Sequence, residues 1–309
     1  MKYAVIALKD VLDKAKDIAN SYNAPIVVFE GGEQNKTREK KAELENELFK
    51  LGVSRNHTLI VIGGGVTLDI GGFVAATFCR GIPWISYPTS LLAMVDASIG
   101  GKTGVNTPFG KNLIGAFHPA QEIKLDLSFL KSLPESEIKN GLSEMIKHGL
   151  IRSRPHFDYL NKHFDSLLKL GPEMELAIRD SIVIKEAVIK EDPYEKGISR
   201  HLLNFGHTVG HAIEADQKYK MSHGQAVALG ILVEMALFGE NKEAVALLNR
   251  LELPKLTLDP KTLWEFMKAD KKSQDKQPLV VKLKEIGKAE SNLVPFTYEE
   301  FSKALQVIS

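Results

Sequence analysis

The sequence predicts an α/β domain with a parallel sheet over residues 1–132, followed by a mostly α-helical domain over residues 133–309. Apolar, strand-like runs alternate with helix-periodic segments in the first third of the chain. Beyond Leu133-Pro134 the strand signals become scarce. A length of 309 residues also exceeds what one hydrophobic core usually holds. Continuous apolar strands that alternate with helices are typical of a parallel sheet covered on both faces.

The first domain is expected to contain five strands, with amphipathic helices between the early ones. The predicted helices cover residues 11–21 and 38–51, where apolar side chains recur at helical spacing. The predicted strands are short apolar runs bounded by polar or turn-forming residues, at residues 3–8, 25–29, 58–62, 82–87 and 122–125.

The second domain is expected to be built from helices, with one lone strand late in the chain at residues 279–283. Apolar residues recur there with a period near 3.6 rather than 2, which indicates helices packed on a shared core. The predicted helices cover residues 137–151, 173–190, 208–216, 224–239 and 261–268.

Composition and charge exclude several classes of protein. The net charge is +1, so no overall field attracts nucleic acid or an anionic membrane surface. The apolar run near the N-terminus meets Lys9-Asp10 too early for a signal peptide or a membrane span, so we expect a cytoplasmic protein. The single cysteine, Cys79, excludes an intrachain disulfide and a cysteine-built zinc site, and we expect a buried, inert thiol.

Two glycine-rich segments are candidates for phosphate binding. Gly63-Gly64-Gly65 ends an apolar strand and leads into a helix start, where backbone amides can approach a diphosphate. Residues 98–106 place Lys102 and several hydroxyls in flexible, glycine-rich backbone. Neither segment has the spacing of a Rossmann fingerprint or a Walker loop. Taken alone, each segment could equally be a tight turn.

Three histidines fall between positions 207 and 223, in a chain that contains only nine. His207 and His211 are one helical turn apart, and His223 opens the next predicted helix. Upstream, Glu144 and Lys147 share one face of a helix and would form a surface ion pair in the simplest interpretation. The histidines could be core residues satisfied by backbone carbonyls. Imidazole and carboxylate donors without thiolate would also suit a catalytic Zn²⁺ with open positions.

At this point the sequence resembles the 3-dehydroquinate synthases, a family of sugar-phosphate cyclases. The resemblance extends over roughly residues 3–290. It is carried by long motifs at residues 63–77, 80–81, 88–103 and 111–117, together with Gly32-Glu33-Gln34 and Lys36 upstream.

The resemblance implies that the first domain binds NAD. Gly31 and Leu68 depart from the family pattern, which usually has aspartate and glycine there, and we expect these departures to tune NAD affinity. The implied NAD-binding residues are Gly32, Glu33, Lys36, Gly65, Val66, Thr67, Leu68, Asp69, Thr89, Ser90, Lys102, Lys111, Phe129, Leu130, Lys131 and Ser132.

The resemblance also implies a metal site and a basic substrate pocket. The metal ligands for Zn²⁺ or Co²⁺ would be Glu144, His207 and His223, which leaves His211 as an acid/base partner. The residues implied for the substrate supply cations for its anionic groups and polar atoms for its hydroxyls, and comprise Arg80, Asp96, Lys102, Asn112, Lys147, Lys185, Arg200, Asn204 and Lys271.

The implied reaction closes a heptulosonate phosphate into the carbocycle 3-dehydroquinate and releases phosphate, with NAD unchanged at the end of each cycle. The expected partner is this small sugar-acid phosphate, with no nucleic acid or membrane, and the expected assembly is a homodimer. The alternatives are an inosose- or valiolone-type cyclase, a glycerol-type metal-dependent dehydrogenase, and a degenerate homologue that only binds ligands.

Overall fold

The computed structural model describes residues 1–195, 197, 199–269 and 277–308. The chain divides into two compact units, Met1–Pro134 and Glu135–Ser309. Among the described residues, no helix combines the length and the apolar character that a membrane span requires.

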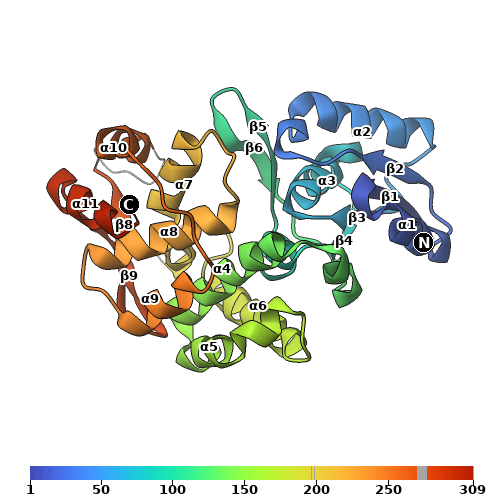
Figure 1. Cartoon of the computed structure of the whole chain (residues 1–309). Helices are drawn as coiled ribbons and strands as arrows, with labels where there is room; N and C mark the ends of the chain where they lie inside the picture. Colours follow the sequence, from blue (N-terminus) through green and yellow to red (C-terminus); the bar gives the residue numbers. More distant parts are fainter. Residues whose placement is uncertain (196, 198, 270–276, 309) are drawn as a thin grey trace. The chain divides into compact units, whose positions relative to one another are not determined.

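The first unit is built on a five-stranded parallel sheet (Figure 1). Its strand order is β2-β1-β3-β4-β7, and each neighbouring pair is parallel. The strands are β1 (Lys2–Leu8), β2 (Ile26–Phe29), β3 (His57–Gly63), β4 (Trp84–Pro88) and β7 (Glu122–Ile123). The predicted parallel α/β domain is therefore confirmed.

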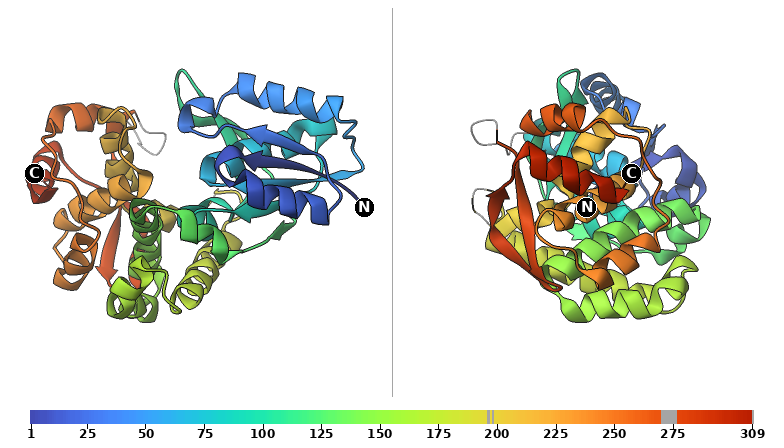
Figure 2. Two further views of the ribbon diagram at one scale, coloured as in Figure 1. Left: turned by 45° about the vertical axis from the view of Figure 1, so that its right-hand side comes forward. Right: turned by 60° about the vertical axis from the view of Figure 1, so that its left-hand side comes forward.

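Helices cover both faces of this sheet, because alternate side chains of each strand point to opposite sides. Ala4 and Ile6 of β1 pack into a core with α2 (Arg38–Lys50) and α3 (Gly65–Thr77). Their neighbours in β1 pack into a second core with α1 (Leu12–Ser21). The left view of Figure 2 shows α1 and α2 on opposite sides of the strands.

Residues 98–106 do not form the flexible loop that the sequence suggested. Lys102–Thr107 is a strand, β5, which pairs antiparallel with β6 (Gly110–Phe117). A hairpin fixes the backbone of Lys102, so a binding role for this segment rests on its side chains. Short helical turns complete the unit at η1 (Lys9–Val11), η2 (Glu33–Asn35), η3 (Phe78–Arg80), η4 (Ala93–Ala97) and η5 (Leu127–Ser132).

The second unit is mostly helical, as predicted, and three of its helices were not anticipated. The predicted ones are α4 (Glu135–Arg152), α6 (Met174–Glu191), α7 (His207–Asp216), α8 (His223–Ala236) and α10 (Pro260–Lys268). The additional ones are α5 (Arg154–Leu168), α9 (Lys242–Asn249) and α11 (Tyr298–Ala304), with the turns η6 (Ser199–Asn204) and η7 (Leu305–Ile308).

The late strand is not alone. β8 (Leu279–Glu285) pairs antiparallel with β9 (Lys288–Pro295), so the prediction of a lone strand is wrong. Half of the residues of β9 are polar or charged, and its register with β8 shifts twice, which weakens the alternating pattern that marks a strand.

Close packing of α7 on α8 depends on glycine. Gly206 precedes α7 with φ of 77°, a left-handed conformation that glycine adopts without strain. A Cβ on Gly230 of α8 would overlap the carbonyl oxygen of Gly206. The backbones of α7 and α8 can therefore approach each other closely at this point. This close approach brings the histidines of α7 near the start of α8.

Candidate metal and nucleotide sites

Helices α4, α7 and α8 of the second unit bring a carboxylate and two imidazoles together. The Glu144 Oε1 atom lies 3.7 Å from His207 Nε2 and 3.6 Å from His223 Nε2. One donor atom from each of the three residues lies within 4.8 Å of the others. The Glu144 side chain is fully buried, whereas the two histidines are partly accessible. This is the same set of three that the family resemblance implied as metal ligands.

The second ring nitrogen of each histidine faces an acceptor. His207 Nδ1 lies 3.1 Å from the carbonyl oxygen of Phe205. His223 Nδ1 lies 3.6 Å from Glu214 Oε1. Both imidazoles therefore turn Nε2 toward Glu144. Glu214 was not among the predicted site residues, although its position two turns after His207 on α7 places it on the same helix face.

The electric field in this cluster favours a cation. Burial by itself would lower the pKa of His223, but the neighbouring carboxylates of Glu144 and Glu214 raise it to about 10. A proton on His223 thus offsets part of the negative charge of the two carboxylates in the metal-free protein. A divalent cation carries more charge and accepts both imidazole and carboxylate donors, so the donor set fits Zn²⁺ or Co²⁺.

His211 lies next to the cluster and offers a second possible ligand set. Its ring centroid is 5.3 Å from that of His207 and 6.1 Å from that of His223. His211, Glu214 and His223 also have donor atoms within 4.8 Å of one another. The two sets share His223. His211 is exposed, whereas Glu144 is fully buried. The exposure of His211 suits a residue that exchanges protons with a ligand.

Two buried polar side chains hold the helix starts that carry the histidines. Asn140, one turn before Glu144 on α4, accepts a hydrogen bond from the Gly224 amide in the first turn of α8, at 2.6 Å. Glu234 accepts from the Gly206 amide at 2.8 Å, at the N-terminus of α7. The sequence analysis missed both residues. An acidic residue in the otherwise apolar second half of α8 was the only signal for Glu234.

Predicted substrate residues of the second unit lie on elements that pack together, namely α4, α6 and η6. Lys147 is buried and forms an ion pair with Glu144, so it is not the surface residue of the simplest interpretation. Lys185 and Arg200 are also buried, and Arg200 donates to the Pro193 carbonyl at 2.6 Å. Asn204 Nδ2 is buried and has no hydrogen-bond partner among the residues that the structure describes. Lys271 lies outside the described residues.

The glycine-rich segment of the first unit joins β3 to α3 at the carboxyl end of the sheet. Gly64 occupies the N-cap position of α3 and supplies no side-chain cap, which leaves the first-turn amides for an acceptor. A Cβ on Gly63 would overlap Thr67, so the turn can close only with glycine. Thr89, which follows β4, donates its amide to the Gly63 carbonyl at 3.0 Å. This cradle suits a dinucleotide diphosphate.

A polar network surrounds Lys36 in the same unit. The buried Lys36 ammonium donates to Asp69 Oδ2 at 2.5 Å and to Asn112 Oδ1 at 2.6 Å. Desolvation raises the pKa of Asp69, and Lys36 opposes that rise; Asp96 also interacts electrostatically with Asp69.

Glu33 belongs to the same region of the first unit. Its carboxylate accepts from Asn106 Nδ2 at 2.7 Å and lies 3.9 Å from Lys111 Nζ. An oriented carboxylate that keeps a free lone pair can accept hydrogen bonds from ribose hydroxyls. The structure thus brings together six of the residues implied for NAD and substrate, and it adds Asn106.

The remaining predicted residues of the first unit are more dispersed. Leu68 and Phe129 pack into the two hydrophobic cores. Cys79 is half-buried rather than buried, and it lies in a left-handed turn with φ of 51° at the edge of the first core. Other residues implied for NAD are exposed or half-buried at Gly32, Gly65, Val66, Ser90, Lys131 and Ser132, and buried at Thr67 and Leu130. Lys102 and Arg80 are exposed.

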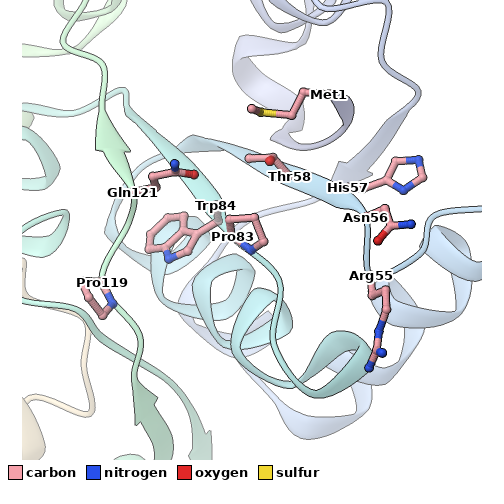
Figure 3. A pocket seen from close by; sticks show the side chains of 9 residues that line it. All are labelled: Met1, Arg55, Asn56, His57, Thr58, Pro83, Trp84, Pro119 and Gln121. Carbon is pink, nitrogen blue, oxygen red and sulfur yellow. The ribbon is translucent and has the colours of Figure 1, made fainter.

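A pocket of about 440 Å³ lies at the opposite end of the strands (Figure 3). Its lining includes the start of β3 at His57 and the start of β4 at Trp84, with Arg55 nearby. It contains none of the predicted site residues.

Two solved structures of sugar-phosphate cyclases share this fold over nearly the whole chain. A 2-epi-5-epi-valiolone synthase from Streptomyces hygroscopicus subsp. jinggangensis, with NAD⁺ and Zn²⁺ bound, matches with a TM-score of 0.90 at 26% identity, over 99% of this chain and 90% of that one. A 2-deoxy-scyllo-inosose synthase complexed with carbaglucose-6-phosphate, NAD⁺ and Co²⁺ matches with a TM-score of 0.89 at 27% identity, over 100% and 91%. The chain has the fold of the sugar-phosphate cyclases.

Sequence comparison narrows this class to one family. Residues 26–140 match the N-terminal model of 3-dehydroquinate synthase, and residues 141–273 match the C-terminal model. The chain belongs to the 3-dehydroquinate synthase family. It is 42% identical to the enzyme from Pelagibacter ubique, over 84% of this chain and 75% of that protein. It is 40% identical to the enzyme from Symbiobacterium thermophilum, over 80% and 72%.

Proposed function

We propose that this chain converts 3-deoxy-D-arabino-heptulosonate 7-phosphate into 3-dehydroquinate and phosphate, using catalytic NAD and a divalent metal ion. The observation that carries the proposal is the convergence of Glu144, His207 and His223 in a member of the 3-dehydroquinate synthase family. The buried cations of the second unit support it further, since the substrate carries both a carboxylate and a phosphate.

The first unit would hold NAD and the second unit the metal. The α3 start would take the diphosphate, and Glu33 the ribose hydroxyls. When bound, NAD accepts a hydride from a secondary alcohol and returns it, while the metal lowers the pKa of alcohol oxygens.

The chain's own residues would bind the substrate and move its protons. Lys147, Lys185 and Arg200 would neutralise its anionic groups, with Lys271 as a further candidate, and Asn204 Nδ2 would donate to a hydroxyl oxygen. His211 would take and return the alcohol proton, because it is exposed and lies beside both His207 and His223. Once the alcohol carbon has become a ketone, the C–H bond on the next carbon is acidic. Loss of that proton then allows phosphate to leave.

The rival cyclases share the fold, but their substrates lack the carboxylate. Glycerol dehydrogenases also share it; the Sinorhizobium meliloti protein matches with a TM-score of 0.68 at 16% identity, which shows the fold alone. The family match and the buried cations favour the dehydroquinate reaction.

The test is an assay of phosphate release from the heptulosonate phosphate, with NAD and Zn²⁺ added. We expect release without net accumulation of NADH at 340 nm. Chelation should abolish release, and Zn²⁺ or Co²⁺ should restore it. Steady accumulation of NADH with glycerol would support the dehydrogenase instead. Metal and NAD binding without turnover of any substrate would support the binding-only homologue. The cytoplasmic location and the homodimer stay predictions.

A further inference from the structure

We propose that Glu214 is a positioning residue for the metal site: its carboxylate holds the Nδ1–H of His223, so that Nε2 is presented to the ion beside Glu144. This inference rests on the proposed metal dependence and extends it to a residue outside the three ligands.

The His223 ring lies between two carboxylates that face its opposite nitrogens. Nε2 lies 3.6 Å from Glu144 Oε1, and Nδ1 lies 3.6 Å from Glu214 Oε1. A neutral imidazole donates through one nitrogen and accepts through the other. A cation beside Glu144 requires the Nε2 lone pair, and the acceptor that faces Nδ1 then keeps the proton on that nitrogen. Metal-bound histidines commonly have such an outer carboxylate or carbonyl partner.

His207 provides an internal comparison. Its Nδ1 faces the neutral carbonyl oxygen of Phe205 at 3.1 Å, and its Nε2 also faces Glu144 Oε1. The two imidazoles are thus oriented alike, but only the partner of His223 carries a charge. Because the partner of His207 is backbone, Glu214 is the one of these two acceptors that a substitution can remove.

Glu214 is placed for this task by α7 and by burial. His207, His211 and Glu214 follow one another along a single face of the helix. The Glu214 side chain is only 7% exposed. A buried carboxylate is costly unless a cation or a hydrogen bond compensates it. His223 Nδ1, at 3.6 Å, is one group that faces this carboxylate.

The test measures metal affinity without NAD or substrate, by titrating Zn²⁺ into the metal-free protein against a chromophoric chelator. Loss of an outer partner typically weakens metal binding about 10- to 100-fold. We expect roughly that range, with Glu214→Gln at about 10-fold and Glu214→Ala at about 100-fold. Glu214→Asp, which keeps the charge, should recover part of the loss. Asp216→Asn is the matched control, since it removes one charge from the same helix away from His223, and it should bind as the wild type does.

A spectroscopic readout separates positioning from general weakening of the fold. In ¹⁵N-histidine NMR spectra of the zinc-loaded protein, the Nδ1–H signal of His223 should shift in Glu214→Gln and stay in Asp216→Asn. Wild-type affinity together with an unshifted signal in Glu214→Gln would overturn the proposal. Wild-type protein that binds Zn²⁺ but releases no phosphate would overturn the proposed function alone. Wild-type protein that binds no metal would overturn both.

Discussion

The rings of His207, His211 and His223 lie within about 6 Å of one another, yet their surroundings differ. His223 faces buried Glu144, whereas His211 is exposed. His223→Ala should therefore lose the bound metal, measured as the molar ratio of zinc to protein after dialysis. His211→Ala should keep the metal and lose turnover. An empty site in His211→Ala would favour the second ligand set, with Glu214 as the carboxylate.

His156 is expected to make stability depend on pH independently of the metal site. It is buried, and burial lowers its pKa to about 4. The unfolded chain binds a proton near pH 6.5 and the folded chain only near pH 4, so stability falls as the pH drops through this window. Between pH 7.5 and pH 5 the loss should be about 2 kcal/mol from this residue.

The measurement is urea unfolding of the metal-free protein at pH 7.5 and pH 5.0. His156→Leu replaces the imidazole by an apolar, non-titrating side chain of similar size. Its free energy of unfolding should change with pH by about 2 kcal/mol less than that of the wild type. Equal pH dependence in the two proteins would show that His156 titrates in the fold as it does in the unfolded chain.

Some residues of the site could be predicted from the sequence and others could not, for a physical reason. Glu144, His207 and His223 carry chemistry that the family motifs preserve, so their types and spacing were visible. Asn140 and Glu234 act through backbone amides of distant segments, at Gly224 and Gly206. Such contacts depend on tertiary packing, and a single sequence does not reveal which carboxylate or amide faces a helix start.

At the scale of elements, the metal site depends on how closely α7 approaches α8. Gly230→Ala would insert a methyl group against the Gly206 carbonyl and force the helices apart. Overpacking of this kind typically costs about 1–3 kcal/mol. We expect that loss of stability in urea unfolding together with weaker Zn²⁺ binding, because His207 would move away from His223.

Ala228→Gly is the matched control on the same helix. It lowers stability by about 1 kcal/mol through helix propensity, and further because it removes a buried methyl group, but it adds no atoms between α7 and α8. Zn²⁺ affinity should therefore stay at the wild-type value in Ala228→Gly and fall in Gly230→Ala. A parallel fall in both would mean that affinity simply follows stability.

Periodicity predicted the long elements of the fold and failed where packing or pairing is local and irregular. The helices α4, α6, α7 and α8 carry apolar residues at helical spacing over several turns. The β5–β6 hairpin contains glycines and a bulge between Val105 and Thr107, which obscure a period of two. Glycine in that segment serves close strand pairing, since a Cβ on Gly115 would overlap the carbonyl of Thr103.

At the scale of the whole molecule, the family resemblance predicts that Arg80 serves the substrate phosphate of a neighbouring subunit. Arg80 lies in the turn η3, where its own φ of 69° and that of Cys79 are left-handed. It is exposed, and its turn lies between α3 and β4. A charge-assisted contact to phosphate contributes about 1.5–3 kcal/mol. Arg80→Ala should therefore weaken substrate binding about 10- to 100-fold and leave NAD and zinc binding unchanged.

Hybrid dimers test whether this arginine acts across subunits. At a substrate concentration well below the wild-type KM, Arg80→Ala chains should show about 1–10% of the wild-type activity, and His207→Ala chains almost none because they lack a metal ligand. Suppose that Arg80 contacts the substrate phosphate of the other subunit. One of the two sites in the hybrid then combines the intact metal cluster of the Arg80→Ala chain with the intact Arg80 of the His207→Ala chain. Activity should therefore return to about half the wild-type value per hybrid dimer, whereas contact within a subunit leaves both sites defective. Hybrids isolated with two different affinity tags and assayed for phosphate release distinguish the two arrangements. If verified hybrids stay inactive, Arg80 does not act across the interface; a protein that is monomeric by sedimentation would exclude the arrangement altogether.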